Sequence, residues 1–466
     1  MGDQILQNNP LEYEKVSILL RRFAIPSIVA MLVSSLYNVI DQLFIVQKMG
    51  YLGNAVTNVA YPMTTITLAA SLLIGVGGAT RFSLNLGRKQ EQEAASTVGN
   101  MLWMSLIFGV LLSLTVEIFT VPLLNAFGAT KTVLPYGITY LRITGIGILF
   151  QVFSNSISKL IRADGSPKYA MVCLVTGAVI NIVLDPIFIF LFDMGIAGAA
   201  WATVLSQVIS CGLAVRYLFR LKSVSLRGTV WKSRPSMWLQ IATLGMSNSL
   251  NQLAITLVQV VMNHSLSYYG LLSVYGEDIP LSGAGVVIKI NSMVLAVFIG
   301  LSQGAQPLLG FNYGAKQYAR VREIYRLAVS SSFIMSTIAF LVFELFPRVI
   351  ISIFGNGNEL YMEFTVKFMR VFLFMILVNG VQLISSGFFS AIGKPLKGTF
   401  LSLARQVVFL IPLMLLLPLK WGLDGILYAA PIADFLAFAI SVLFVFREMK
   451  MIRKKEILPE VESQKK

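Results

Sequence analysis

The chain has few of the side chains that soluble enzymes use as ligands and nucleophiles. Its 466 residues include one histidine, His264, and two cysteines, Cys173 and Cys211. So few ligands exclude a zinc cluster, a haem site and a framework of disulfide bonds. Charged residues make up 13% of the chain, whereas soluble domains carry about 25%. A cofactor loop and a nucleophile–base pair are also missing, so we expect neither an enzyme nor a bound cofactor.

Apolar residues, in contrast, are abundant. They make up 56% of the chain, and the mean hydropathy is +0.76. A helix needs about 20 apolar residues to cross a bilayer, and apolar stretches of nearly this length recur along the whole chain. This pattern predicts an all-α polytopic membrane protein. No cleavable signal pattern stands at the start, so the first span should remain in the membrane. Apolar length and breaker residues predict twelve spans: 16–46, 55–80, 97–122, 135–158, 169–192, 196–219, 238–264, 282–308, 326–350, 362–390, 399–419 and 424–446.

Basic residues are concentrated in alternate connecting segments. Lys and Arg number 37, against 22 acidic residues, and the net charge is +15. Most of them lie in the N-terminus and in 81–89, 159–168, 216–234, 316–326, 394–397 and the tail from Arg447. Such a bias marks the cytoplasmic side, so both termini should be cytoplasmic. The positive charge is therefore a topology signal, and we expect no nucleic-acid partner.

The two halves of the chain repeat each other. The segment "GGATRFSLNLGRKQ" (77–90) recurs as "GAQPLLGFNYGAKQ" (304–317) at an offset of 227 residues. Each half would hold six spans, and an even number makes the repeats parallel, related by an axis along the membrane normal. We therefore predict two pseudo-symmetric six-helix bundles. Their bounds are 16–219 and 237–447, with a cytoplasmic linker at 220–236 and a basic cytoplasmic tail at 448–466.

An acidic residue stands inside the apolar stretch "NIVLDPIFIF" (181–190). A charged side chain at the centre of a bilayer costs about 2.5–3.5 kcal/mol on insertion scales, so such residues usually serve a function. Burial favours the neutral form of Asp185, which suits a group that takes up and loses a proton. Asn181 lies one turn earlier on the same helix face, and Pro186 lacks the N–H that would continue the helix.

A second acid, Asp41, lies in the first span in "SLYNVIDQLFIVQ". Tyr37 and Asn38 precede it by four and three residues, so all three lean the same way. The two acids predict a proton or cation site, with Na⁺ as the possible metal ion. The alternative is a structural hydrogen-bond cluster that holds the neighbouring spans together.

The second half has a different polar pattern. Its first span contains amides but no acid, whereas basic residues and the acid Asp434 occur inside later spans. The basic residues could reach the membrane surface, or they could have a cavity or inter-helix role. The acid could assist coupling or pair with a basic residue. The cavity candidates of this half are Asn251, Gln252, Lys289, Gln303, Gln306, Arg405 and Asp434.

Five motifs together resemble the MATE (multidrug and toxic compound extrusion) family, closest to its bacterial DinF-like and MepA-like branch. They are "YNVIDQLFI", "LNLGRKQ", "IRADGSPKYA", "NIVLDPIFIF" and "GLSQGAQPLLGFNYGAKQ". The resemblance spans roughly residues 15–450 and implies two lobes that alternate between outward-open and inward-open states. It also implies a polar pocket in the first lobe, formed by Tyr37, Asp41, Asn155, Asn181, Asp185 and Thr203. Some branches place a glutamate in the seventh span, and its absence here argues against their sodium-site arrangement.

The same resemblance implies a function in the bacterial cell membrane. It suggests a monomeric multidrug efflux antiporter that exports amphiphilic organic cations, such as dyes and antibiotics, in exchange for H⁺ or possibly Na⁺. Membrane lipids are its other expected partners. The alternative functions are a lipid-linked precursor flippase or an endogenous-metabolite exporter of the same MOP superfamily. A flippase for pyrophosphate-linked lipids should have a cavity crowded with Arg and Lys, which the acids of the first half do not favour.

The predicted topology is tested by labelling single cysteines. Cysteines placed in 223–236 and 313–319 should react with a membrane-impermeant thiol reagent only from the cytoplasmic side, because these segments carry the basic residues. Cysteines in 270–280 should react only from outside. Cytoplasmic labelling of 270–280 would contradict the twelve-span arrangement.

Overall fold

Long apolar helices form nearly all of the described chain. The computed structural model describes residues 10–226, 228–353 and 358–463, and every regular element in these ranges is helical. Ten helices are long and apolar enough to cross a membrane, and the bent pair α13 (Glu359–Phe372) and α14 (Ile376–Ala391) makes an eleventh. The predicted span 238–264 corresponds to α9 (Pro235–Leu271), which has 37 residues but contains several amides. The predicted all-α polytopic fold is confirmed.

The remaining helices follow the order of the predicted spans. The first half contains α2 (Pro10–Tyr13), α3 (Val16–Met49), α4 (Tyr51–Gly87), α5 (Glu91–Ala126), α6 (Leu134–Ala163), α7 (Pro167–Pro186), η1 (Ile187–Leu191) and α8 (Gly195–Leu218). The second half contains η2 (Gly228–Trp231), α9, α10 (Asp278–Gly314), α11 (Tyr318–Leu345), α12 (Pro347–Ser352), α13, α14, α15 (Pro395–Leu403), η3 (Ala404–Leu410), α16 (Ile411–Leu416), α17 (Pro418–Trp421) and α18 (Leu423–Ser463).

Several predicted spans are interrupted or extended. The π-helix η1 follows Pro186 directly, where the missing N–H ends the regular hydrogen-bond ladder. The predicted span 399–419 is divided among α15, the π-helix η3, α16 and α17. The axes of α13 and α14 differ by 48°. Helix α18 continues through residue 463, so the predicted tail boundary at 448 is not a structural break. Residues 227, in the linker, and 464–466, at the end of the tail, lie outside the described residues.

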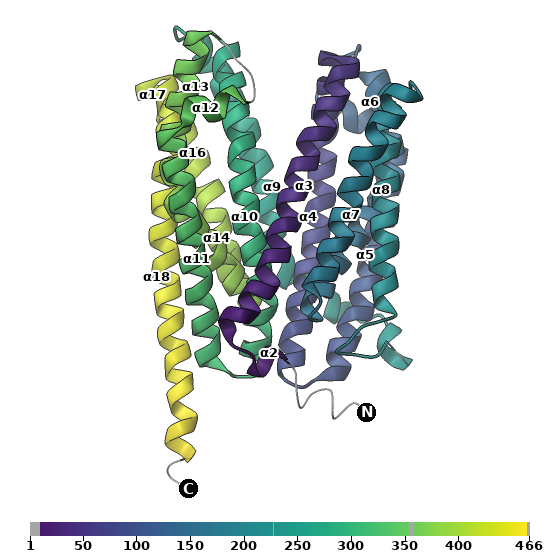
Figure 1. Ribbon diagram of the computed structural model, residues 1–466, viewed down its shortest axis with the longest axis vertical. Coiled ribbons are helices and arrows are strands. Elements are labelled where there is room, and N and C mark those ends of the chain that lie inside the picture. The colour runs from purple at the N-terminus through teal and green to yellow at the C-terminus, as the bar shows by residue number, and fades with distance from the viewer. Residues whose placement is uncertain (1–9, 227, 354–357, 464–466) are drawn as a thin grey trace.

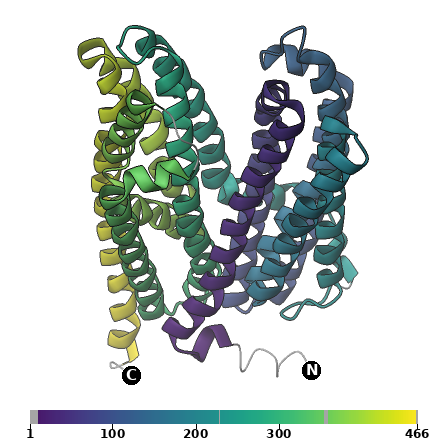
Figure 2. The same ribbon diagram turned by 45° about the horizontal axis from the view of Figure 1, so that its top comes forward.

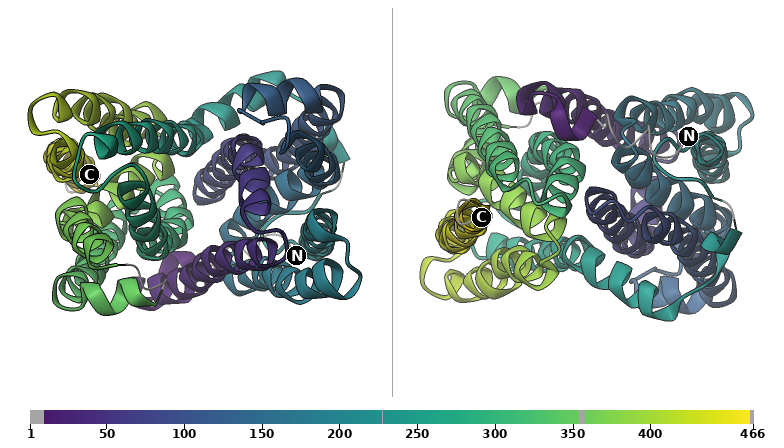
Figure 3. Two further views of the ribbon diagram at one scale, coloured as in Figure 1. Left: turned by 90° about the horizontal axis from the view of Figure 1, so that it is seen from above. Right: turned by 90° about the horizontal axis from the view of Figure 1, so that it is seen from below.

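The helices are arranged in two bundles. Helices α3 to α8 form one, which we call the N-bundle, and α9 to α18 form the other, the C-bundle (Figures 1 and 3). The two bundles converge at the end of the molecule where both chain termini lie and diverge toward the opposite end (Figures 1 and 2). One buried apolar cluster lies wholly within the C-bundle. The largest cluster crosses from the N-bundle into the C-bundle, so the bundles share part of their core.

Glycines allow the two bundles to touch backbone to backbone. A Cβ added to Gly77 of α4 would lie 1.9 Å from the carbonyl oxygen of Ile241 in α9. A Cβ added to Gly304 of α10 would lie 2.6 Å from the Cα of Ala24 in α3. Because the two glycines are repeat equivalents, the contact of α4 with α9 mirrors that of α10 with α3. Small residues permit such close helix approach in membranes.

A further pair of glycines lies between the two central helices. A Cβ on Gly87 would lie 2.0 Å from the carbonyl oxygen of Phe311, and one on Gly314 would lie 2.2 Å from that of Leu84. The offset of 227 residues relates both the glycines and their partners. Each repeat therefore presents the same surface to the other, as across a two-fold axis. The axis passes between α4 and α10.

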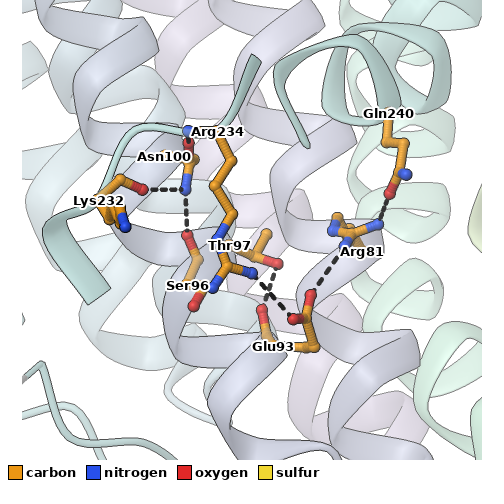
Figure 4. Close-up of polar contacts among 8 residues, drawn as sticks. All are labelled: Arg81, Glu93, Ser96, Thr97, Asn100, Lys232, Arg234 and Gln240. Atoms are coloured by element: carbon orange, nitrogen blue, oxygen red, sulfur yellow. Dashed lines mark hydrogen bonds and ion pairs between the residues drawn. The ribbon is translucent and has the colours of Figure 1, made fainter. Parts of the chain in front are cut away.

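Polar contacts reinforce the convergent end (Figure 4). The two carboxylate oxygens of Glu93 in α5 each accept a 3.1 Å hydrogen bond, one from Arg81 of α4 and one from Arg234 at the start of α9. Arg81 also donates to Gln240 of α9. Asn100 Oδ1 accepts from the backbone N–H of Arg234 at 2.8 Å. These contacts bind the linker and the start of the C-bundle to the N-bundle.

The glycine contacts predict a specific effect of added side-chain volume. Gly77→Ala should separate the bundles at their convergent end, because the obstacle is backbone and cannot move aside. A cysteine at Ala305, which is 1% exposed in α10, should then react several-fold faster with a water-soluble thiol reagent. Gly212→Ala is the control, since nothing lies within 4 Å of its added Cβ. Equal reaction rates in the two variants would contradict the packing described.

Candidate ion and substrate site

A polar pocket lies inside the N-bundle. Its volume is about 200 Å³, and its walls come from α3, α4, α6, α7 and α8. Tyr37, Asn38 and Asn155, which the sequence predicted, line it directly. The other polar lining residues are Ser34, Thr64, Gln151, Ser154, Ser206, Gln207 and Ser210. The pocket is thus built mainly from hydroxyl and amide groups, which can both donate and accept hydrogen bonds.

One wall of this pocket is formed where α6, α7 and α8 pack closely together. Ser154 Oγ and Ser210 Oγ are 2.9 Å apart, and Ser210 Oγ also donates to the carbonyl oxygen of Cys173 at 2.9 Å. A Cβ added to Gly177 would lie 3.2 Å from the Cβ of Ser210. Small residues on facing helices therefore bring α7 and α8 close enough for their polar side chains to meet.

Asn181 connects the predicted residues of α7 and α8. Its Nδ2 donates to Asp185 Oδ1 at 3.3 Å and to Thr203 Oγ1 at 3.5 Å. Asn181 and Asp185 are 1% and 0% exposed. Asp185 Oδ2 and Asn181 Oδ1 have no hydrogen-bond partner among the described residues. Buried acceptors without partners are rare, so these two oxygens are candidate positions for binding a proton, a cation or a water molecule.

Asp41 of α3 completes an acidic pair with Asp185. The two carboxyl groups lie within interaction range of each other, and the phenol groups of Tyr37 and Tyr140 lie close to both acids. Asp41 Oδ1 is also buried without a partner among the described residues. Two adjacent carboxylates in a low-dielectric site repel each other, so a proton or cation between them is strongly favoured.

The C-bundle candidates do not gather at one site. Arg405 of η3 donates through Nε to Asp434 Oδ1 of α18, and their side chains are 17% and 2% exposed. This ion pair joins η3 to α18, so Arg405 has an inter-helix role and Asp434 pairs with a basic residue. Asn251 and Gln252 are half-buried on α9, and Lys289 is exposed on α10.

Gln303 and Gln306 lie outside the C-bundle interior. Both line a small cavity between the bundles, and Gln303 Oε1 accepts a hydrogen bond from Arg162 of the N-bundle. The prediction that they belong to a C-bundle cavity therefore does not match their position. Their helix, α10, presents this face to the N-bundle because its glycines permit close approach there.

Several lining residues were not predicted from the sequence. Gln207 lies one helical turn after Thr203 on α8, a spacing that could have indicated it, and its Oε1 is buried without a partner among the described residues. Tyr140 carries no such local signal, because it approaches the acids from a distant part of α6. Within the described ranges, no group of three or more His, Cys, Asp or Glu residues could hold a metal ion.

Two bundles of membrane helices in contact at one end, with a polar pocket inside one of them, are the architecture of a secondary transporter. The MatE family model matches residues 26–187 and 248–416. The chain therefore belongs to the MatE family, whose members are transporters and not enzymes.

Curated relatives match almost end to end. The Multidrug export protein MepA of Staphylococcus saprophyticus is 24% identical over 456 residues, which cover 96% of this chain and 98% of the relative. The Multidrug export protein MepA of Staphylococcus aureus strain NCTC 8325 is 22% identical over 429 residues, covering 91% and 92%.

Solved structures agree with the fold. A crystal structure of MATE in complex with MaL6 superposes with a TM-score of 0.88 at 23% identity, covering 97% of this chain and 99% of that one. The outward-facing conformation of a MATE family transporter of the MOP superfamily gives 0.88 at 22% identity, covering 97% and 98%. At this identity the likeness concerns the fold.

The ion pair between Arg405 and Asp434 yields a stability prediction. Asp434→Leu should destabilise the protein by about 3–5 kcal/mol, because it leaves a buried cation without a partner. The double variant Arg405→Met/Asp434→Leu should recover most of that loss. Thermal unfolding in detergent, followed by circular dichroism, measures both.

A matched control uses the exposed ion pair between Lys367 and Asp424, whose side chains are each 39% exposed. Asp424→Leu should cost about 1 kcal/mol or less, the usual contribution of an exposed pair. If the unfolding temperature of Asp434→Leu is no lower than that of Asp424→Leu, burial of the ion pair does not increase the cost of breaking it.

Proposed function

We propose that this protein is a multidrug efflux antiporter, which exports amphiphilic organic cations in exchange for protons or Na⁺ by alternating access. The main support is the acidic pair Asp41 and Asp185, buried beside a polar pocket and holding carboxylate oxygens without partners. The relatives named Multidrug export protein MepA support the substrate class.

Competition for negative charge provides the coupling mechanism. With the acids ionised, the N-bundle pocket attracts a cation. Protonation of one carboxyl group halves the negative charge of the pair and so weakens cation binding. Substrate and proton then oppose each other's binding by the same factor, which is antiport by linkage. Na⁺ would act in the same way, because carboxylate and amide oxygens are suitable ligands for a hard cation.

The packing supports an outward-facing arrangement. These hydrogen bonds between the bundles all lie in one half of the molecule. That half extends from the middle of α3 and α10 to the end that carries the basic segments. If the basic segments are cytoplasmic, the bundles are closed toward the cytoplasm and separated toward the outside. Protons from outside would then reach the N-bundle pocket. Pro26 in α3 and Pro186 in α7 give both acid-bearing helices a position at which to bend.

In this proposal the bundles move as two lobes, 16–219 and 237–447, joined by the linker 220–236. The protein acts as a monomer in a bacterial cell membrane, with lipids around it and both termini in the cytoplasm. A flippase for pyrophosphate-linked lipids is disfavoured because the residues lining the N-bundle pocket include neither Lys nor Arg. An endogenous organic cation as the natural substrate fits the same acidic pair.

Neutralising either acid should uncouple transport. Asp41→Asn and Asp185→Asn should insert and fold normally, since the amide is close in size to the protonated acid. Export of a cationic dye from vesicles under an imposed pH or Na⁺ gradient should fall on the order of tenfold or more, the scale of one coupling interaction. Asp193→Asn is the control, because that exposed acid pairs with Lys48 outside the pocket. Full export by both pocket variants would remove the pair from the mechanism.

The competition mechanism has a separate equilibrium readout. The affinity of the wild type for a monovalent cationic dye, measured by fluorescence polarisation, should fall as pH is lowered from mildly alkaline to mildly acidic. Asp41→Asn should flatten this dependence, since one of the two titrating groups is gone. Wild-type affinity that is constant across the range would rule out direct competition.

A further inference from the structure

Two basic side chains are buried where the bundles meet. Lys159 and Arg162 lie on α6 and are 8% and 3% exposed. They line a cavity of about 20 Å³ together with Thr80 and Ser83 of α4 and Gln306 of α10. The walls of this cavity therefore come from both bundles. It is separate from the N-bundle pocket, with which it shares no lining residue.

No acid among the described residues compensates the two basic groups. Neither forms an ion pair there, and the charged group that acts on Lys159 is Arg162 itself. Arg162 Nη1 donates to Gln303 Oε1, but Arg162 Nη2 has no partner within the described part of the chain. Because an arginine remains protonated in proteins, a positive charge is buried here without a counter-charge. Such burial is costly unless an anion accompanies it.

A second unsatisfied group faces the same cavity. Ser83 Oγ is buried and has no hydrogen-bond partner among the described residues. The amide of Gln306 adds a further potential donor to the lining. Guanidinium, ammonium, hydroxyl and amide N–H groups thus surround one small space. This donor-rich lining is suited to an anion and would repel a cation.

The size of the cavity limits the occupant to a single atom or one water molecule. About 20 Å³ is enough for one small sphere, so a monatomic anion suits the space better than phosphate or sulfate. A water molecule could satisfy the donors but would supply no charge. We propose that this cavity binds a monatomic anion, chloride, held between Arg162, Lys159 and Ser83 of the N-bundle and Gln306 of the C-bundle.

The proposed anion would favour one arrangement of the bundles. Its ligands lie together only while α10 packs against α4 and α6. A ligand that binds one arrangement better shifts the population toward it. Chloride should therefore stabilise contact between the bundles at the convergent end. This inference rests on the packing and the buried charges, and it holds whether or not the protein exports drugs.

Thermal stability tests the site without any transport assay. The purified wild type, in detergent at constant pH and ionic strength, should unfold a few degrees higher in sodium chloride than in sodium gluconate, with saturation as chloride rises. Sodium sulfate stabilises proteins generally, so any increase that it gives should be the same in the wild type and in Arg162→Gln. Arg162→Gln should abolish the chloride effect, and Arg326→Gln, which changes an exposed arginine on α11, should retain it. Ser83→Ala leaves Lys159 and Arg162 in place and should reduce the stabilisation by chloride. This variant tests the site even if Arg162→Gln does not fold.

A second measurement separates binding in this cavity from a general salt effect. A cysteine at Ala305, buried next to the bundle contact, should react more slowly with a thiol reagent in chloride than in gluconate. In Arg162→Gln, or in Ser83→Ala if needed, this difference should disappear or shrink. Equal stability of the wild type in chloride and gluconate would overturn the proposal, as would a chloride effect that is unchanged in these variants.

Discussion

Backbone contact between the bundles is the interaction on which the rest of the structure depends. Gly77 and Gly304 remove the side chains that would keep α4 from α9 and α10 from α3, and the two contacts are related by the repeat. Because helices in a membrane gain little from hydrophobic exclusion, close van der Waals packing must provide the association. Three other features depend on this contact, because each needs the bundles to be close together. They are the convergent end itself, the hydrogen bonds to Glu93 and the cavity beside Arg162.

Buried charges at three places in the described chain have different surroundings. Asp434 is neutralised within the C-bundle by Arg405, which makes a structural ion pair. Asp41 and Asp185 are of like sign and leave acceptor oxygens unsatisfied. Arg162 and Lys159 are the inverse case, with like positive sign and an unsatisfied donor. The paired charge is already neutralised, whereas a ligand of opposite sign would stabilise each of the other two sites, so we expect function at those two.

Much of the fold and part of the site could be predicted from the sequence, because these depend on local patterns. Apolar length located the spans, and the repeat predicted two bundles. Helical spacing brought Asn181 to Asp185, as the 3.3 Å hydrogen bond confirms. Tyr140 could not be found in this way, since its approach to the acids depends on how α6 packs against α3 and α7. The position of Gln303 and Gln306 likewise depends on contact between bundles, which no spacing within one helix encodes.

The repeat is kept in the backbone but broken in the polar side chains, and this asymmetry bears on function. Pro186 in the first half and Pro412 in the second lie in equivalent parts of the repeat, and a π-helix lies next to each. Beside Pro186 stands an unpaired acid, whereas the π-helix before Pro412 carries Arg405, already neutralised by Asp434. Both bundles therefore have a similar irregular helix, but the acid next to it in the N-bundle forms no ion pair among the described residues. Coupling is thus expected to act through the N-bundle, while the C-bundle serves as the surface against which it closes.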